Sequence, residues 1–412
     1  MSTTSSSSSS DSLGPDDFYK VCKLGQGHQG KVYLVQRRGT RQLYAMKIVS
    51  KKDLVRNGKV SRVLTERELL KSADHPFVTT MYHSFQSKKA LYLVMEYCSG
   101  GDLFELQRKQ PENRFDEATA RFYAAEILIG LEYLHVIGFM YRDIKAENVM
   151  VQANGHISLG DFDLAVQMKE PAGGLRLDST GHTVDSGNSL FRTKSFLGTV
   201  EYMAPEVLAG SGYGESIEWW SFGILVYRML TGKTPFHDGD MDTMLRRIHS
   251  HEKVKFPSDV KMSKTVKSFI LKLVEPDVRK RMTLEKIRAH KWFKDIDWAL
   301  IRNQKAPIVP EAPKIKMGSK ERIADDLLDS SDEDGETSVF GKFGWRSRET
   351  PPPSPHIDGT PGSRSVSPLN SAGDNSDDND SDGSDSDSDE SDDDSDSDVS
   401  DDDSDSDDET SS

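Results

Sequence analysis

The sequence is short of cysteine and has no long apolar run. It contains two cysteines among 412 residues, Cys22 and Cys98, too few for a disulfide framework. A reducing compartment, cytoplasmic or nuclear, is therefore expected. No run of about 18 apolar residues occurs, and the serine-rich start of the chain does not resemble a signal segment. We expect no membrane span.

Basic residues are absent from the last part of the chain. Residues 374–412 contain 21 acidic residues and no Lys or Arg, whereas residues 1–373 carry 53 basic and 47 acidic residues. The net charge of −15 thus belongs to the tail, and the remainder is mildly basic at +6. Such a tail cannot bury a core, so we expect it to be disordered, as we do the serine-rich leader, residues 1–17.

The tail repeats Ser-Asp between Ser376 and Ser406, a pattern that resembles the sites of acidophilic kinases. Two interpretations remain open. The tail is either a solubilising segment, or it binds basic proteins or competes with basic substrates for the surface of Asp102 and Glu147.

Apolar periodicity outlines the rest of the chain. Strand patterns fill residues 18–49 and 91–97, and helical patterns fill residues 57–72 and 116–137. Further helices are expected in residues 219–231 and 263–292. A segment rich in Gly, Ser and Thr, residues 168–194, predicts a long loop, and Pro307, Pro310 and Pro313 predict an extended strap.

A glycine-rich turn precedes a lysine within an apolar strand. Gly25, Gly27 and Gly30 allow a hairpin to approach phosphates with its backbone N–H groups, although an ordinary hairpin has the same composition. Lys47 lies a strand's length later, where an unpaired charge would be costly. We expect phosphates and Glu66 to be its partners, although a solvated helix face is the alternative for Glu66.

A second segment combines charged and amide side chains at fixed offsets. Asp143 is suited to accept a hydroxyl proton, and Lys145 to neutralise a transferring phosphoryl group. Asn148 and Asp161 offer the oxygen ligands that Mg²⁺ prefers. Aspartate and asparagine in turns are the alternative interpretation, which the four matching offsets make improbable.

These segments occur in the chain order of a eukaryotic protein kinase. Tyr141-Arg142-Asp143, Ala204-Pro205-Glu206 and a trailing Phe340-x-x-Phe343 element resemble the AGC group of serine/threonine kinases. The resemblance implies an α+β, bilobal kinase fold with a small β-rich N-lobe, a larger α-helical C-lobe and disordered termini. The implied boundaries are a leader (1–17), a kinase domain (18–293; N-lobe 18–95, C-lobe 99–293), a C-terminal extension (294–346) and an acidic tail (347–412).

The resemblance also implies the cofactors ATP and Mg²⁺. The implied nucleotide-binding residues are Leu24, Gly25, Gln26, Gly27, His28, Gln29, Gly30, Lys31, Val32, Ala45, Lys47, Glu66, Met95, Glu96 and Cys98.

Regulation and substrate choice follow from the same resemblance. Ser195 occupies the position that an upstream kinase phosphorylates, with Arg142 and Arg62 as the expected partners of the phosphate. Asp102 and Glu147 match positions that bind an Arg three residues before the target. The expected partners are therefore basic protein substrates, an upstream kinase and acidophilic kinases acting on the tail. We expect a monomer that does not bind nucleic acid directly.

Three departures from the AGC pattern concern regulation more than chemistry. Asp163 stands where Gly is usual after Asp-Phe, as in plant and related fungal AGC kinases. Glu218 replaces an Asp, and its extra methylene is expected to loosen a bond to the catalytic-loop backbone. Gly344 stands where relatives carry a phosphorylatable residue, so regulation there is expected to be phosphate-free or absent. A catalytically weak pseudokinase scaffold is the alternative function, and a small-molecule kinase fits less well.

Overall fold

The computed structural model describes residues 13–27, 30–168, 200–210, 213–311, 313, 315, 321–323 and 338–347. The chain divides into two units, residues 1–358 and 359–412, and every described residue lies in the first. The expectations for residues 1–12 of the leader, residues 169–194 of the loop and residues 348–412 of the tail therefore fall outside the described residues. Residues 13–17 of the leader are described, and Pro15–Asp17 form a 3-10 helix, so the predicted start of order at residue 18 was wrong.

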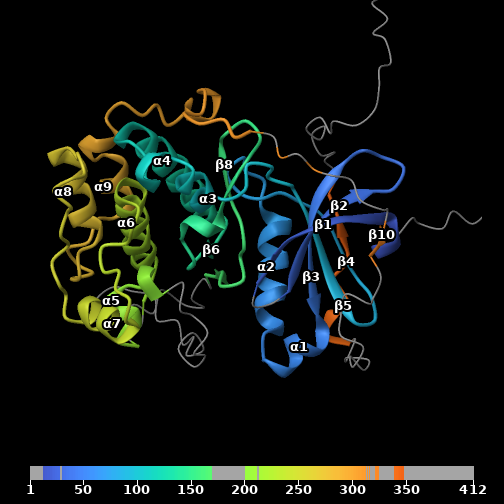
Figure 1. Ribbon diagram of the computed structural model, residues 1–412. Helices are drawn as coiled ribbons and strands as arrows, with labels where there is room; N and C mark the ends of the chain where they lie inside the picture. Colours follow the sequence, from blue (N-terminus) through green and yellow to red (C-terminus); the bar gives the residue numbers. More distant parts are fainter. Residues whose placement is uncertain are drawn as a thin grey trace, which may run out of the picture. The chain divides into compact units, whose positions relative to one another are not determined.

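A seven-stranded antiparallel sheet dominates the N-lobe (Figure 1), with the order β10-β1-β2-β3-β5-β4-β11. The residues of β3, β4 and β5 are almost all buried, and their β-branched and aromatic side chains suit strands that are covered on both faces. The strands are β1 (Phe18–Gln26), β2 (Lys31–Arg37), β3 (Leu43–Ser50), β4 (Met81–Gln86), β5 (Ala90–Met95), β10 (Glu321–Arg322) and β11 (Trp345–Arg346).

Two helices lie between β3 and β4, where the sequence predicted only one, over residues 57–72. They are α1 (Lys51–Arg56) and α2 (Val60–Ser72). Asn57 ends α1, its N–H donating to the carbonyl of Asp53 at 3.0 Å, and Gly58 follows with φ +63°. The predicted start of the helix was therefore wrong by three residues.

Helices make up most of the C-lobe. They are α3 (Leu103–Arg108), α4 (Glu117–Val136), α5 (Pro205–Leu208), α6 (Ser216–Thr231), α7 (Met241–His249), α8 (Lys264–Leu273) and α9 (Leu284–Arg288). The α4 helix begins at Asp116, which accepts a hydrogen bond from the Thr119 N–H at 2.8 Å. Its buried face shares one core with α6, whose Trp219 and Trp220 are almost fully buried.

Short strands hold the catalytic segments between the lobes. Antiparallel pairs join β6 (Phe139–Met140) to β9 (Val166–Gln167) and β7 (Val149–Val151) to β8 (Ile157–Leu159). Residues 141–148 run from β6 to β7 and residues 160–165 run from β8 to β9, so the two strand pairs fix both ends of each segment.

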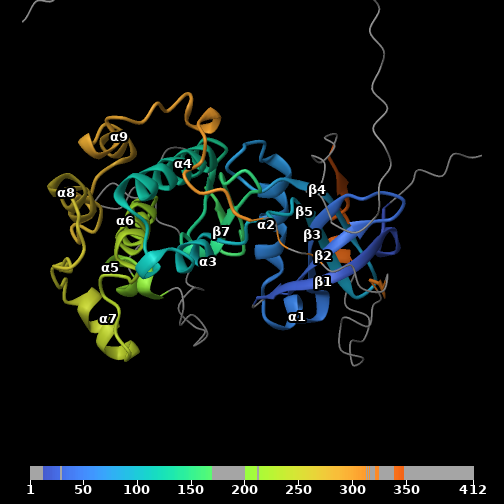
Figure 2. The ribbon, with the colours of Figure 1, turned by 45° about the horizontal axis from the view of Figure 1, so that its top comes forward.

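After the last C-lobe helix the chain forms a strap over α4 (Figure 2). The Tyr123 hydroxyl of α4 donates to the carbonyl of Ile308 at 3.5 Å, and Ala306 is buried. The strap then contributes β10 and β11, one at each edge of the N-lobe sheet. No described helix is long and apolar enough to cross a bilayer.

Candidate active site

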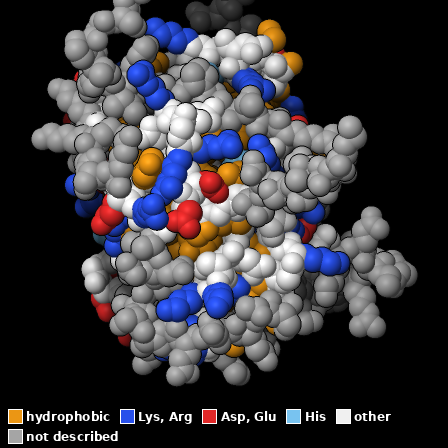
Figure 3. All heavy atoms as spheres, turned by 90° about the vertical axis from the view of Figure 1, so that its right-hand side faces the viewer, with side chains coloured by type: hydrophobic (Ala, Val, Ile, Leu, Met, Phe, Trp, Pro, Cys, Tyr) orange, Lys and Arg blue, Asp and Glu red, His pale blue; other side chains and the backbone are white. Residues whose placement is uncertain are grey.

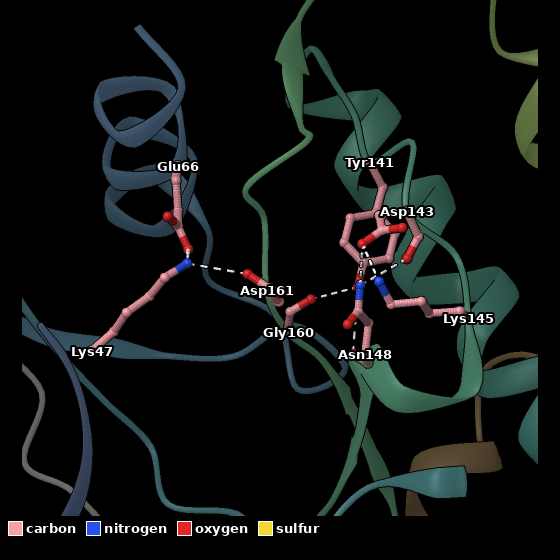
Figure 4. Close-up of polar contacts among 8 residues, drawn as sticks. All are labelled: Lys47, Glu66, Tyr141, Asp143, Lys145, Asn148, Gly160 and Asp161. Atoms are coloured by element: carbon pink, nitrogen blue, oxygen red, sulfur yellow. Dashed lines mark hydrogen bonds and ion pairs between the residues drawn. The ribbon is translucent and has the colours of Figure 1, made fainter. Parts of the chain in front are cut away.

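Lys47 on β3 lies between two carboxylates from different elements (Figure 4). Its Nζ is 2.6 Å from Oε1 of Glu66 on α2 and 3.1 Å from Oδ1 of Asp161. The side chains of Lys47 and Glu66 are 9% and 1% exposed. The ion pair between Lys47 and Glu66 that the sequence suggested is present, and it joins the sheet to the helix.

Burial and the neighbouring charges oppose each other at this pair. Burial disfavours the charged lysine, but the carboxylates of Asp161 and Glu66 outweigh it and raise the pKa of Lys47. Burial also raises the pKa of Glu66 to about 7, although Lys47 opposes the shift. The raised pKa of Lys47 favours its charged form, whereas the raised pKa of Glu66 favours its neutral form. Because the protonated ammonium touches Glu66 directly, we take the pair to be charged near neutral pH.

Asp143 lies at the centre of the second cluster in Figure 4. Its Oδ2 accepts hydrogen bonds from Lys145 Nζ and Asn148 Nδ2, each at 2.7 Å. Its Oδ1 is buried and has no partner within the described part of the chain. Burial raises the pKa of Asp143, and the Lys145 ammonium partly offsets that rise. One carboxylate oxygen is thus held in place by two donors, while the other makes no hydrogen bond to the described residues.

The backbone around this cluster is held in uncommon conformations. Arg142 and Asp161 have φ angles of +64° and +48°, which non-glycine residues rarely adopt. The Tyr141 hydroxyl donates to the carbonyl of Gly160, and the rings of Tyr141 and Phe162 lie 5.2 Å apart. Backbone strain of this kind persists where the surrounding structure fixes the chain. Here the strained backbone orients the side chains of Asp143 and Asp161.

The oxygens of Asn148 and Asp161 suit a magnesium ion. Asn148 directs its amide nitrogen to Asp143, which leaves its oxygen free for a cation. Lys47 lowers the pKa of Asp161, so this carboxylate is ionised, and its side chain is 52% exposed. Within the described ranges no group of three His, Cys, Asp or Glu residues is arranged to hold a metal. A pair of protein oxygens fits Mg²⁺, which usually takes its other ligands from phosphates and water.

Glu218 corrects one expectation. The extra methylene, predicted to loosen its bond, does not do so, because Oε1 accepts the Arg142 N–H at 2.7 Å. The other carboxylate oxygen contacts Nε2 of His135, and the Glu218 side chain is fully buried. The longer side chain therefore connects α4 to the catalytic loop.

Most of the expected nucleotide-binding residues lie on β1, β2 and β3, at the end of β5 and directly after it. Val32 pairs with Lys47, Ala45 pairs with Met95, and the Gly27 N–H donates to the carbonyl of Gly30 at 2.9 Å. Of the others, Leu24, Gly25 and Gln26 lie on β1, Lys31 begins β2, Glu96 and Cys98 follow β5, and His28 and Gln29 fall outside the described residues. Thus β1, β2, β3 and the segment after β5 meet beside Lys47.

The two residues expected to bind substrate lie at the start of α3 and in the 3-10 turn Ala146–Asn148. Asp102 is the N-cap of α3, where its Oδ1 accepts the Glu105 N–H at 2.8 Å, and Glu147 is exposed. Burial raises the pKa of Asp102, the Glu105 N–H opposes the rise, and the negative charge of Glu147 adds to it. The negative charge of Glu147 therefore acts on Asp102.

Ser195 lies outside the described residues, but both of its expected partners are described, Arg62 on α2 and Arg142 after β6. Arg142 donates from Nε to the Leu164 carbonyl at 2.8 Å and from Nη1 to the Tyr213 hydroxyl at 3.1 Å. Arg142 therefore already joins the segment after Asp161 to the start of α6.

The residues that bind the Phe340-x-x-Phe343 element were not predicted from the sequence. Phe340 and Phe343 are buried, and Arg67 donates to the carbonyls of Lys342, Phe343 and Gly344. Ser84 Oγ donates to the Phe343 carbonyl at 2.7 Å, and Gln86 Nε2 donates to the Phe340 carbonyl at 2.8 Å. The alternation of polar Ser84 and Gln86 on β4 was the only local signal.

Comparison with known proteins agrees with this geometry. The protein kinase domain profile matches residues 18–293. Flippase kinase 1 of Saccharomyces cerevisiae is 43% identical over 305 residues, covering 72% of this chain and 34% of that protein. The serine/threonine-protein kinase nrc-2 of Neurospora crassa is 44% identical, covering 72% of this chain and 50% of that one. Arabidopsis thaliana AGC1-7 is 35% identical, covering 73% and 64%.

The chain thus spans between a third and two thirds of the length of these relatives. The match covers both lobes and every residue of the two clusters around Lys47 and Asp143. This chain belongs to the protein kinase family and is a relative of the fungal and plant AGC serine/threonine kinases.

Proposed function

We propose that this protein transfers the γ-phosphoryl group of Mg-ATP to serine or threonine hydroxyls of proteins. The observation that supports this most is the pairing of two clusters. One holds Lys47 between Glu66 and Asp161, and the other holds Asp143 between Lys145 and Asn148. Phosphoryl transfer needs such positioned charges more than covalent chemistry from the protein.

Each side chain has a definite task in this reaction. Lys47 would bind the phosphates of ATP, and the oxygens of Asn148 and Asp161 would hold Mg²⁺, which would supply positive charge beside the phosphates. Asp143 orients the substrate hydroxyl through its unpartnered Oδ1 and accepts its proton as the bond from the hydroxyl oxygen to the γ-phosphorus forms and the bond from that phosphorus to ADP breaks. Lys145, 2.7 Å from Asp143 Oδ2, stabilises the transferring phosphoryl group.

We further propose that the preferred substrate carries Arg three residues before the target. Asp102 and Glu147 form a negative site for that guanidinium. Phosphorylation of Ser195 by an upstream kinase would add nearly two negative charges, which Arg142 and Arg62 are suited to bind. The protein is expected to act as a monomer in the cytoplasm or nucleus.

The first experiment measures phosphate transfer from Mg-ATP to a serine peptide that carries this Arg. Asp143→Asn is expected to lower kcat by at least about 100-fold, because only the proton acceptor is removed. Ser195→Ala shows whether the proposed switch is required. Absence of transfer by the wild type, even after an upstream kinase has modified Ser195, would instead favour the pseudokinase scaffold.

Substrate choice has its own matched variant. Asp102→Asn removes the charge, but the amide oxygen can still cap α3. The variant is therefore expected to fold normally and to lose its preference for the Arg peptide over the same peptide with Ala. If the preference remained in both Asp102→Asn and Glu147→Gln, these carboxylates would not be the Arg site.

A further inference from the structure

The strap returns to the nucleotide-binding edge of the N-lobe as β10. It pairs with β1 in antiparallel register, Tyr19 opposite Arg322 and Lys20 opposite Glu321. Lys20 Nζ lies 3.0 Å from Glu321 Oε2. Without β10, the outer side of β1 would be an unpaired sheet edge. The strap thus completes the sheet at the strand that leads into the glycine-rich turn.

Ile323, directly after β10, is buried in a hydrophobic cluster that is separate from the main core. It is 3% exposed and shares this cluster with Phe18 at the start of β1. The ring of Phe18 lies 6.0 Å from those of Tyr44 and Phe85. Figure 3 looks onto this end of the sheet, where hydrophobic side chains appear between Lys and Arg side chains. Ile323 therefore adds an apolar anchor to the backbone pairing.

The β1 strand needs such support because its pairing with β2 is irregular. Register shifts interrupt the ladder between Lys20 and Cys22 and again between Lys23 and Gly25. Bulges of this kind bend a strand and weaken its ladder locally. The β10 pairing holds β1 just before the first shift, while Leu24 and Gly25 follow the second. The placement of the glycine-rich turn therefore depends on how firmly the start of β1 is held.

We propose that Ile323 and β10 are positioning elements for the nucleotide site. They keep β1 in the register that brings Leu24 and the glycine-rich turn over the nucleotide, opposite Lys47. The short strand β10 supplies the contact between the strap and this edge of the sheet. The inference rests on the proposed use of ATP. Releasing the strap lowers the fraction of molecules whose site is formed, which weakens apparent affinity in proportion.

The test compares the wild type with Ile323→Ala, Ile323→Val and Val309→Ala. Val309 lies on the same strap but is 52% exposed, so its truncation serves as the matched control. Ile323→Ala is expected to raise the KM for ATP and the Kd of a fluorescent ATP analogue about 5- to 10-fold. The kcat and the KM for peptide should change by less than about twofold. Ile323→Val should restore most of the affinity, and Val309→Ala should behave as the wild type.

Hydrogen exchange separates positioning from general destabilisation. Amides of residues 18–26 should exchange faster in Ile323→Ala, while those of α4 and α6 should be unchanged. Unchanged ATP affinity, or faster exchange throughout the protein, would overturn the inference. If the wild type bound the nucleotide but transferred no phosphate, the proposed function would fail, and the binding and exchange measurements would still decide the role of Ile323.

Discussion

Arg67 Nε donates a hydrogen bond to the carbonyl oxygen of Phe343 at 3.3 Å, across 276 residues of sequence. The same guanidinium donates to the carbonyls of Lys342 at 2.9 Å and Gly344 at 3.2 Å. Arg67 directly follows Glu66, the partner of Lys47. The docked element thus contacts the residue next to the ion pair, with backbone carbonyls as its ligands. This supports the expectation that docking here needs no phosphate.

Phe343→Ala is expected to lower kcat/KM for peptide phosphorylation about tenfold. Loss of the ring empties a buried pocket and releases the carbonyls from Arg67, so α2 no longer holds Glu66 as firmly against Lys47. Coupling between sites in proteins commonly changes function about 5- to 150-fold. Steady-state kinetics of the purified variant would measure the effect, and unchanged kcat/KM would show that the element does not influence Glu66.

Gly344→Ala provides the matched control for this prediction. A Cβ on Gly344 would meet its nearest atom, the Ser84 carbonyl oxygen, at 3.9 Å, an ordinary contact distance. Activity and stability should both remain at wild-type levels. A large loss in this control would mean that glycine itself is required there.

Arg281 is expected to be among the most sensitive residues for stability. It is buried, and its guanidinium contacts both carboxylate oxygens of Glu206 at 2.6 and 3.1 Å. Arg281→Ala should lower the free energy of unfolding by about 3–5 kcal/mol, because it leaves a carboxylate largely buried without its partner. Arg279→Ala removes a nearby exposed arginine paired with Asp277 and should leave the denaturant midpoint unchanged. Similar midpoints for the two variants would contradict this argument.

The sequence predicted well those features that depend on residues close together in the chain. Asp143, Lys145 and Asn148 lie within six positions, so their spacing alone indicated one cluster. The sites of Arg67, Arg281 and Ile323 could not be found in this way, because their partners are far away in sequence. The helix that ends at Ser72 was predicted correctly except for its start, which was placed three residues too early. Its charged residues fit a continuous helical pattern, but Asn57 and Gly58 favour a local turn.

Gly155→Ala tests whether the strap is fixed on the C-lobe by close backbone contact. Gly155 has φ +88°, and an added Cβ would lie 2.2 Å from the Ile308 carbonyl oxygen. Gly39 has φ +72° with open space around it, so Gly39→Ala should lose about 1 kcal/mol from backbone strain alone. Gly155→Ala should lose clearly more in urea unfolding, and proteases should cleave its strap faster. Equal losses of unfolding free energy in Gly155→Ala and Gly39→Ala would show that the strap can move away from Gly155 without a loss of stability.

His135 gives the last prediction, on how stability depends on pH. Its Nε2 contacts Glu218, and its Nδ1 lies 3.5 Å from Glu215 Oε2. Burial alone would lower the pKa of His135, but these carboxylates outweigh it, so the folded pKa is raised above 6.5. The folded state therefore binds this proton more tightly than the unfolded chain does. The stabilisation is complete below pH 6.5 and is lost as the pH rises through the folded pKa. His135→Asn should thus lose more stability at pH 6 than at pH 8.5, whereas replacing the exposed His249 by Asn should change both equally. A His135→Asn loss that was independent of pH would show that the imidazole is neutral and acts only as a hydrogen-bond donor to Glu218.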